Sequence, residues 1–406
     1  KKPMNSCSLC GQCTVTCPNG FDMSQVCKSA RENMVSTDKM PLAPHEFALM
    51  DMLFSNSDAF LCKLQPGYET CRYVFFPGCQ AGAIAPDVVM DAYEDLCARV
   101  EGGVGLILGC CGAISEWAGR YEMTEKVNEQ LKQEIAKLGD PVIIAGCPSC
   151  MKQLKENTGA EVRGIWEILK EIGLPGKARG LEMPVAIHDA CGARGDARTQ
   201  DTIRELLTAM GCTVEDTEYS RDLSPCCGYG GLTAYANKEM AAKMTEKCLE
   251  RSDAPYITYC MACRDRFARE GRESRHILEL LYGDNACNMP DISEKRYNRL
   301  VLKEKLLKNI WNEELMMEKK DYTVAYTEDA IRMMDERMIL KSDVEHVLAD
   351  YRESQEAVFD EETKELVTRS RLGNVTFWVR FVETEEGYLV HRAYSHRMNI
   401  MKRVGQ

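Results

Sequence analysis

The stretch Val104-Gly105-Leu106-Ile107-Leu108-Gly109-Cys110-Cys111-Gly112 leads an apolar segment straight into a pair of adjacent cysteines. A second Cys-Cys-Gly occurs at Cys226-Cys227-Gly228, and each pair has one cysteine upstream and a Cys-x-x-Cys downstream at similar spacing. The first set is Cys79, Cys110, Cys111, Cys147 and Cys150, and the second set is Cys191, Cys226, Cys227, Cys260 and Cys263. Cysteines that keep their order and spacing over such a long period indicate an internal duplication.

Adjacent thiols suit a metal cluster better than disulfides. Two neighbouring residues are too close to serve comfortably as independent disulfide ends, whereas each thiolate can bind a different iron of one cluster. A cubane [4Fe-4S] cluster needs four thiolates, and each set offers five. The sequence therefore predicts clusters of unusual shape, with a bridging thiolate or an opened cage. The cysteines that lack partners at ligand spacing are expected to be small buried residues; they are Cys97, Cys212, Cys248 and Cys287.

The N-terminal region carries a third cysteine pattern, Cys7-x2-Cys10-x2-Cys13-x3-Cys17-Pro18. This is the spacing of bacterial ferredoxins, in which three close thiolates wrap one cubane cluster. Zinc is the weaker alternative, because zinc sites favour two well-separated arms. The fourth ligand stays open between Cys17, Cys27, Cys62 and Cys71, and a second cubane could be completed by a partner chain or by residues that precede Lys1.

The two five-cysteine sets resemble the Cys-Cys-Gly domain that occurs twice in the catalytic subunit of heterodisulfide reductases, over about residues 72–285. The resemblance implies that each set binds a non-cubane [4Fe-4S] cluster and that the two clusters face one another around a disulfide substrate, which makes the ten cysteines the expected catalytic residues. The fused ferredoxin-type run resembles the D-type organisation of that family. One departure is that the second Cys-x-x-Cys reads Cys260-Met261-Ala262-Cys263 and lacks the proline of the first.

Strands and helices are expected to alternate in both copies. Strands are predicted at 73–76, 104–108 and 142–145 and again at 185–188, 213–215 and 256–259, with helices at 86–100 and 123–138 and again at 202–210 and 233–250. This order predicts an α/β fold, a duplicated cysteine-rich domain with parallel sheets. The cysteines fall just past the carboxyl ends of strands, where open α/β sheets place their sites. Gly112 and Gly228 are expected to let backbone approach the cofactor.

Four domains are predicted. Residues 1–71 form a small helical ferredoxin-like module with a connector, 72–180 and 181–289 form the two repeats, and 290–406 form a charged helix (294–320) followed by a small α+β domain.

The glycine-rich segment Gly102 to Gly109 does not match a dinucleotide-binding fingerprint, because its glycines precede and enclose the strand instead of following it. No flavin or NAD is therefore expected on this chain.

His188 lies close to Cys191 and has two interpretations. It is either a catalytic proton donor to a departing thiolate or a strand-end residue that satisfies backbone groups. The two interpretations are left open.

Composition limits the functional classes. The 406 residues carry a formal net charge of −12, which disfavours nucleic acid as a partner. The 21 cysteines are clustered, which indicates metal binding and not disulfides. The sequence shows no signal peptide and no apolar run long enough to cross a membrane. An oxygen-sensitive, cytoplasmic metalloprotein is therefore expected. Expected partners are a flavin- or NAD(P)-binding redox subunit, a ferredoxin or another iron–sulfur subunit, and a disulfide or thiol substrate.

Two functions follow. The first is a subunit of heterodisulfide reductase type, an oxidoreductase in which two non-cubane clusters reduce or form a disulfide with electrons from the N-terminal cubane. The second is an electron-relay subunit of a flavoprotein complex, of the lactate/glycolate oxidase or electron-bifurcating kind, with no disulfide chemistry.

Overall fold

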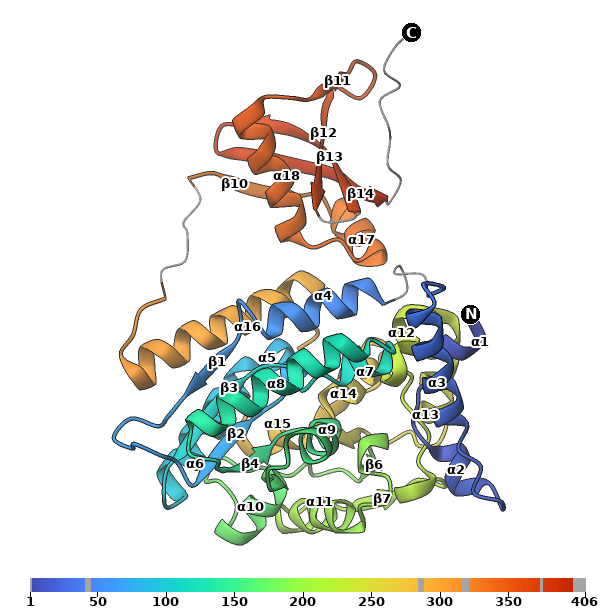
Figure 1. Cartoon of the computed structure of the whole chain (residues 1–406), viewed down its shortest axis with the longest axis vertical. Helices are drawn as coiled ribbons and strands as arrows, with labels where there is room; N and C mark the ends of the chain where they lie inside the picture. The colour runs from blue at the N-terminus through green and yellow to red at the C-terminus, as the bar shows by residue number, and fades with distance from the viewer. Residues whose placement is uncertain (1, 41–44, 284–287, 316–320, 373–374, 397–406) are drawn as a thin grey trace. The chain divides into compact units, whose positions relative to one another are not determined.

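The computed structural model describes residues 2–40, 45–283, 288–315, 321–372 and 375–396 (Figure 1). The chain divides into two compact units, residues 1–289 with 296–314 and residues 290–295 with 315–406. Each unit is described by itself. Among the described residues, no helix combines the length and the apolar character needed to cross a lipid bilayer.

The first repeat is built on a five-stranded sheet in the order β1-β3-β2-β4-β5. Its strands are β1 (Leu61–Lys63), β2 (Tyr73–Phe76), β3 (Val104–Leu108), β4 (Val142–Ala145) and β5 (Val162–Gly164). Only β1 runs antiparallel to its neighbour. Every residue of β3 is buried, because helices cover a parallel sheet on both faces. The predicted strands at 73–76, 104–108 and 142–145 are confirmed; β1 and β5 were not predicted.

Helices alternate with these strands as expected. They are α5 (Cys79–Ile84), α6 (Pro86–Arg99), α7 (Ala113–Trp117), α8 (Tyr121–Lys137), α9 (Pro148–Thr158) and α10 (Ile165–Ile172). The two long helices, α6 and α8, fall within two residues of their predicted bounds.

The second repeat has the same topology as the first. Its parallel sheet has the order β7-β6-β8-β9, which matches β3-β2-β4-β5 strand for strand. The strands are β6 (Val185–His188), β7 (Val214–Asp216), β8 (Tyr256–Thr258) and β9 (Ser274–His276), with helices α11 (Ala197–Ala209), α12 (Thr233–Ala236), α13 (Lys238–Leu249), α14 (Met261–Arg269) and α15 (Ile277–Tyr282). The predicted duplicated α/β fold is confirmed.

One helix prediction in this repeat is wrong. The single helix expected over 233–250 is broken at Asn237, which has non-helical backbone angles. The Asn237 side chain accepts a hydrogen bond from the Met240 backbone and so caps a new helix. Two helices, α12 and α13, result.

Helices flank the repeats within the first unit. At the N-terminal side these are α1 (Lys2–Asn5), α2 (Gln12–Thr16), α3 (Met23–Ser36) and α4 (Glu46–Ser55). After the second repeat, α16 (Ile292–Leu306) continues into one π-helical turn (Leu307–Trp311), so the helix expected over 294–320 is shorter than predicted. Arg299 of α16 pairs with Asp51 at 2.7 and 2.9 Å and donates to the Cys79 carbonyl at 2.9 Å, which fastens this helix to the first repeat.

The second unit is a small α+β fold. Its sheet has the order β10-β14-β13-β12-β11, with only β10 and β14 parallel. The elements are β10 (Thr323–Tyr326), α17 (Glu328–Arg337), α18 (Lys341–Ser354), β11 (Val358–Asp360), β12 (Glu365–Leu372), β13 (Val375–Thr384) and β14 (Gly387–His396). Val347 and Leu348 of α18 pack with Val379 and Phe381 of β13 in its core.

Candidate metal centre

In the first repeat, each cysteine of the set follows the carboxyl end of a strand. Cys79 comes after β2 and opens α5, and the pair Cys110-Cys111 comes after β3. Cys147 follows β4 as the N-cap of α9, and Cys150 lies in the first turn of that helix. Helix N-termini present unpaired N–H groups and a positive dipole end, which stabilise thiolates and anionic clusters.

The second set occupies the corresponding places. Cys191 opens a short 3₁₀ helix (Cys191–Ala193) after β6, and Cys260 is the N-cap of α14. The backbone at Cys260 (φ −132°, ψ 117°) is close to that at Cys147 (φ −146°, ψ 131°). Both Cys-x-x-Cys motifs therefore begin with an extended residue that caps a helix, although the second lacks the proline.

Each cysteine pair ends in a glycine with left-handed backbone angles. Gly112 has φ 86° and Gly228 has φ 92°. A Cβ atom at Gly228 would lie 2.5 Å from the Ala241 carbonyl oxygen. Glycine is required here for the chain to turn sharply after the pair and enter the next helix.

The thiols of the first set form one chain of contacts. The Cys79 thiol lies within hydrogen-bonding reach of Cys110, Cys110 and Cys150 both reach Cys111, and Cys150 reaches Cys147. Donation by Cys110 and Cys150 lowers the pKa of the Cys111 thiol to about 6, while the contact with Cys110 and burial raise the pKa of Cys79. Because most of these thiols stay protonated without metal, binding iron must release protons.

The second set repeats this chain and joins the first. Cys226 accepts from Cys191 and Cys227, which lowers the pKa of Cys226, and Cys263 links Cys227 to Cys260. Cys260 also contacts Cys147 of the first repeat, and this contact lowers the pKa of Cys260. Ten cysteines from distant parts of the sequence therefore form one continuous group. The members are Cys79, Cys110, Cys111, Cys147, Cys150, Cys191, Cys226, Cys227, Cys260 and Cys263.

A cavity opens beside this group, with an empty volume of about 550 Å³. We call it the thiol chamber. It is lined by Cys79, Cys110, Cys111, Cys147, Cys150 and Cys260, together with apolar residues and the polar side chains of Gln80, Ser149 and Tyr229. No carboxylate or histidine lines the chamber among the described residues. Six soft sulfur ligands without a carboxylate suit an iron–sulfur cluster better than magnesium or calcium, which prefer carboxylate oxygens.

His188 lies beside the second set, outside the thiol chamber. Its ring packs edge-on against Phe267, with centroids 4.8 Å apart, and its ligand atoms and those of Cys227 and Cys263 all lie within 4.8 Å of one another. Burial lowers the pKa of His188 to about 4, so the imidazole is neutral. Its Nε2 atom is buried and has no hydrogen-bond partner. An unpartnered ring nitrogen beside two buried thiols is suited to contact a bound metal group.

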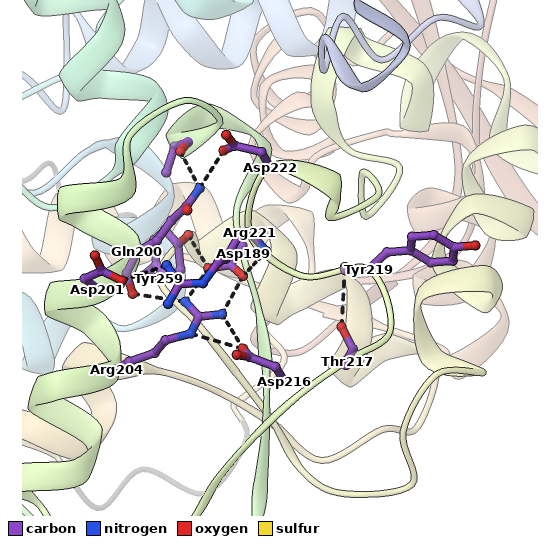
Figure 2. A network of polar contacts seen from close by, with 11 residues as sticks. Asp189, Gln200, Asp201, Arg204, Asp216, Thr217, Tyr219, Arg221, Asp222 and Tyr259 are labelled. Atoms are coloured by element: carbon purple, nitrogen blue, oxygen red, sulfur yellow. Dashed lines mark hydrogen bonds and ion pairs between the residues drawn. The ribbon is translucent and has the colours of Figure 1, made fainter. Parts of the chain in front are cut away.

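A polar network fixes the backbone around the second set (Figure 2). The buried carboxylate of Asp189 accepts from Arg204 at 2.8 and 2.9 Å, from the Arg221 backbone at 2.6 Å and from the Tyr259 hydroxyl at 2.9 Å. Asp189 precedes Cys191 and Tyr259 precedes Cys260, so this one side chain ties together two strand ends that carry cysteines. Sequence patterns gave no signal for this network, because its members are far apart in the chain.

We expect Asp189→Asn to destabilise the first unit by about 1.5–3 kcal/mol, because the change removes the charge-assisted bonds of this buried carboxylate to Arg204, which keeps only the more exposed partner Asp216. Anaerobic denaturant unfolding of the iron-loaded protein measures the change. Asp201→Asn is the matched control in the same network: Asp201 pairs with Arg221 at an exposed position and should change stability by at most about 1 kcal/mol. Equal effects of the two variants would contradict the role given to Asp189.

The N-terminal run brings Cys7 against Cys27 of α3. The two thiols are within hydrogen-bonding reach, and the Leu9 N–H donates to the Cys7 sulfur at 3.4 Å. Burial raises the pKa of Cys7 to about 11. Of the residues left open as a fourth ligand, Cys62 contacts the Glu134 carbonyl and Cys71 lies near Cys97, so both belong to the first repeat.

Cys13 is exposed, and the Cys17 thiol lies in a turn. Backbone N–H groups of Phe21 and Asn19 lower the pKa of Cys17. An accessible, anion-stabilised thiol of this kind is suited to bind metal.

The N-terminal run packs against the second repeat. The Ser8 side chain hydrogen-bonds the Cys226 thiolate, and Arg194 donates to the Cys10 carbonyl at 2.8 Å. The contact with Cys226 and burial raise the pKa of Cys191, and the charge of the nearby Cys10 raises it further. The ferredoxin-type segment is therefore adjacent to the second cysteine set.

Comparison with known families identifies both repeats. Residues 73–155 and 185–268 match the family described as "Cysteine-rich domain", known as CCG. No solved structure matches the chain.

The curated relatives include two proteins described as iron–sulfur proteins and one heterodisulfide reductase subunit. An iron–sulfur protein of Methanocaldococcus jannaschii is 25% identical over 243 residues, which covers 56% of this chain and 48% of the relative. One of Methanococcus maripaludis is 25% identical over 281 residues, covering 64% and 55%. The chain thus spans about half the length of these two relatives. The D-type component of the dihydromethanophenazine:CoB–CoM heterodisulfide reductase of Methanosarcina acetivorans is 22% identical over 316 residues, covering 68% and 74%.

Proposed function

We propose a function from the premise that the chain is a heterodisulfide reductase-like iron–sulfur protein with two cysteine-rich domains. Its proposed role is that of an oxidoreductase subunit that reduces or forms a disulfide. Each five-cysteine set would bind one non-cubane [4Fe-4S] cluster, and the N-terminal run would bind a cubane. When bound, these groups would supply single electrons and iron atoms that can hold sulfur.

One observation carries this proposal: the two sets meet at Cys147 and Cys260 beside the thiol chamber. A pure electron relay needs clusters within transfer distance of one another, but it needs no direct contact between the two ligand sets. A disulfide reductase needs both sets close enough to hold the two sulfurs of one substrate. The contact between Cys147 and Cys260 supports that arrangement.

Residues outside the two five-cysteine sets would position and tune the proposed clusters. Ser8 and Arg194 hold the N-terminal run against the second set, which makes the second set the nearer of the two to incoming electrons. Cys27 contacts Cys7 and is the fourth cubane ligand that we favour, with Cys7, Cys10 and Cys13; Cys17 would remain for a second cluster. His188 would contact the second cluster and tune it, because a ring nitrogen of His188 lies near the Cys227 and Cys263 thiols, its Nε2 has no hydrogen-bond partner, and the residue does not line the chamber.

Similarity to a heterodisulfide reductase subunit implies a multi-subunit complex. The proposed partners are a flavin- or NAD(P)-binding subunit and a ferredoxin or another iron–sulfur subunit, which would deliver electrons to the N-terminal run. The alternative function, an electron-relay subunit of a flavoprotein complex, predicts the same partners but no substrate in the chamber.

The decisive test is metal analysis of anaerobically purified protein with low-temperature electron paramagnetic resonance. Three four-iron clusters predict about twelve irons per chain, and a paramagnetic species should appear only when a thiol is added under mild oxidation. The same iron without a thiol-dependent species would support the relay. About four irons per chain would mean that the paired cysteines are not cluster ligands.

We expect His188→Ala to retain full iron and to shift the thiol-dependent signal or the reduction potential of the second set. The reason is that a neutral N–H donor beside cluster sulfur stabilises the reduced, more negative state. Redox titration followed by electron paramagnetic resonance measures the shift, and His188→Gln, which keeps a donor, should shift less. Lost turnover at full iron with an unchanged potential would instead favour the proton-donor role.

A further inference from the structure

The sheet of the second unit has one covered face and one open face. Helices α17 and α18 pack against the covered face (Figure 1), and Val379, Phe381 and Ala393 belong to the core on that side. Successive residues of a strand point to opposite faces of the sheet. The residues next to these core positions therefore face away from both helices. The proposed cluster chemistry uses none of them.

Arginine gathers on the open face. Arg369 and Arg371 come from β12, Arg380 comes from β13 and Arg392 comes from β14. Arg369, Arg371 and Arg392 are exposed. The surrounding sequence is acidic, since residues 321–396 hold seventeen acidic and nine basic residues. Four of the nine basic residues thus share one face of the sheet.

The arrangement of these arginines works against folding. Arg380 and Arg392 are direct register partners on neighbouring strands, and like charges directly opposite one another destabilise a sheet. Asp360 and Glu365 both pair with Arg380. Within the part of the chain that the structure describes, neither Arg369 nor Arg392 forms an ion pair. Both guanidinium groups are therefore free to bind an external anion.

A row of planar side chains crosses the same face. Trp378 of β13 and Tyr394 of β14 are register partners, and their rings lie 5° from parallel with centroids 6.0 Å apart. Arg369 of β12 continues the row, with its guanidinium carbon 5.0 Å from the Trp378 ring centroid. The Trp378 Nε1–H donates to Nε2 of His396 at 2.8 Å and so fixes the indole. Aromatic rings interleaved with guanidinium groups suit nucleobases, which stack on both.

The carboxylate of Glu365 lies at one end of this face and is neutralised there. Its Oε1 lies 2.6 Å from Nδ1 of His391, and its Oε2 lies 3.1 Å from Nε of Arg380. A carboxylate held between a histidine and an arginine repels a nearby anion less than a free one does. The rest of the face keeps its positive charge.

We propose that the open face of the second unit binds single-stranded nucleic acid. Phosphates would lie at Arg369 and Arg392, and bases would stack against Trp378 and Tyr394. An acidic protein would match the arginines, but it offers few planar groups to the aromatic row. A duplex keeps its bases stacked on one another, whereas a single strand exposes them. The net charge of −12 disfavours nucleic acid for the chain as a whole, but it does not describe this face.

The test measures fluorescence anisotropy of labelled oligouridylate and oligothymidylate of about twelve nucleotides with the full-length, iron-loaded protein. Arg369→Ala combined with Arg392→Ala should raise the Kd by about tenfold or more at low salt. It should also lower the slope of log Kd against log salt by about 1.4, because each phosphate contact on a single strand contributes about 0.7.

The matched control is Arg332→Ala combined with Arg337→Ala. It removes the same charge from exposed positions of α17, which covers the other face of the sheet. Its Kd should stay within about twofold of wild type. Circular dichroism checks the fold of both double variants. If the first of them loses its fold, Arg392→Gln with Arg337→Gln as control makes the same comparison.

A second readout tests the role of the bases. An abasic oligonucleotide of the same length should bind the wild type about tenfold more weakly than oligothymidylate, and Tyr394→Leu should reduce that difference. Equal affinity for both strands would overturn base stacking on this face.

Three further outcomes would overturn the proposal. They are no binding of either probe at low salt, equal weakening in the two double variants, and equally tight binding of a polyglutamate peptide, which would assign the face to an acidic protein. Iron content and paramagnetic signals should match wild type in every variant. A failure here would therefore leave the proposed cluster chemistry untouched.

Discussion

Replacing Arg31 with alanine will release the N-terminal cysteine run from the two repeats. The Arg31 side chain is fully buried and donates hydrogen bonds to four backbone carbonyls. Two lie at the N-terminal end, at Met4 of α1 (3.0 and 2.8 Å) and at Cys7 of the run (2.6 Å). One follows each cysteine pair, at Trp117 (2.6 Å) and Gly231 (2.8 Å). One side chain therefore joins three parts of the unit.

The expected loss is large. Each buried carbonyl left without a donor costs about 1–3 kcal/mol, so four of them approach the whole stability of a typical domain, about 5–15 kcal/mol. Among the described residues no carboxylate accepts from Arg31. Its charge lies beside Cys7 and Cys27, where an anionic cluster would balance it.

Limited proteolysis of the iron-loaded protein should show new cleavage within residues 1–40 of Arg31→Ala, together with the loss of about four irons, one cubane. Arg31→Lys keeps the charge but loses hydrogen-bond donors, so its proteolytic resistance and iron content should lie between those of Arg31→Ala and the wild type. The control is Lys28→Ala, one turn earlier in α3. Lys28 pairs with Glu116 at a partly exposed position, and its loss should cost at most about 1 kcal/mol. Intact proteolytic resistance in Arg31→Ala would refute the linking role.

Sequence patterns predicted the parts of this protein that depend on local order. The apolar run at 104–108 predicted strand β3, and the cysteine pair after it predicted the turn and the duplicated domain. These predictions were possible because a buried parallel strand and its glycine turn are encoded within a few residues. The edge strands β5 and β9 were missed. Each has three residues with a charged residue in the middle, Arg163 or Arg275, so neither shows the apolar run of a buried strand.

The connections between parts were beyond the reach of sequence patterns. Arg31 looks like any charged residue of an amphipathic helix, and its partners Trp117 and Gly231 are 86 and 200 positions away. Cys27 could not be ranked above Cys62 by spacing, although only Cys27 contacts the run in the structure. Tertiary packing decides such pairings, and packing is set by the whole chain.

The second large effect is expected at the cysteine pairs. Cys227→Ala should remove about four irons per chain and one paramagnetic species, because this thiol connects Cys226 to Cys263 in the second set. Cys111→Ala should do the same for the first set, where Cys111 accepts from Cys110 and Cys150. The variant carrying both changes should keep only the iron of the N-terminal run.

Cys248→Ala provides the matched control for burial. Cys248 and Cys227 are both 2% exposed, and Cys248 lies close to the second set. Its thiol instead donates to the Cys226 carbonyl at 3.5 Å, and burial raises its pKa to about 12. A Cys-to-Ala change removes one sulfur atom from a packed interior at each site, so both variants lose similar packing. Only Cys227→Ala removes a proposed ligand.

The comparison therefore separates ligation from packing. If Cys227→Ala loses iron and Cys248→Ala retains it, the loss comes from the missing thiolate and not from a damaged core. If both keep about twelve irons, the adjacent cysteines do not bind clusters, and the chamber between the two sets loses its proposed chemistry. Equal loss of iron from both variants would show that the core of the second repeat tolerates neither change. Cys111→Ala would then decide the question in the first repeat. Its control is Cys97→Ala, a change at a half-buried cysteine of the same repeat.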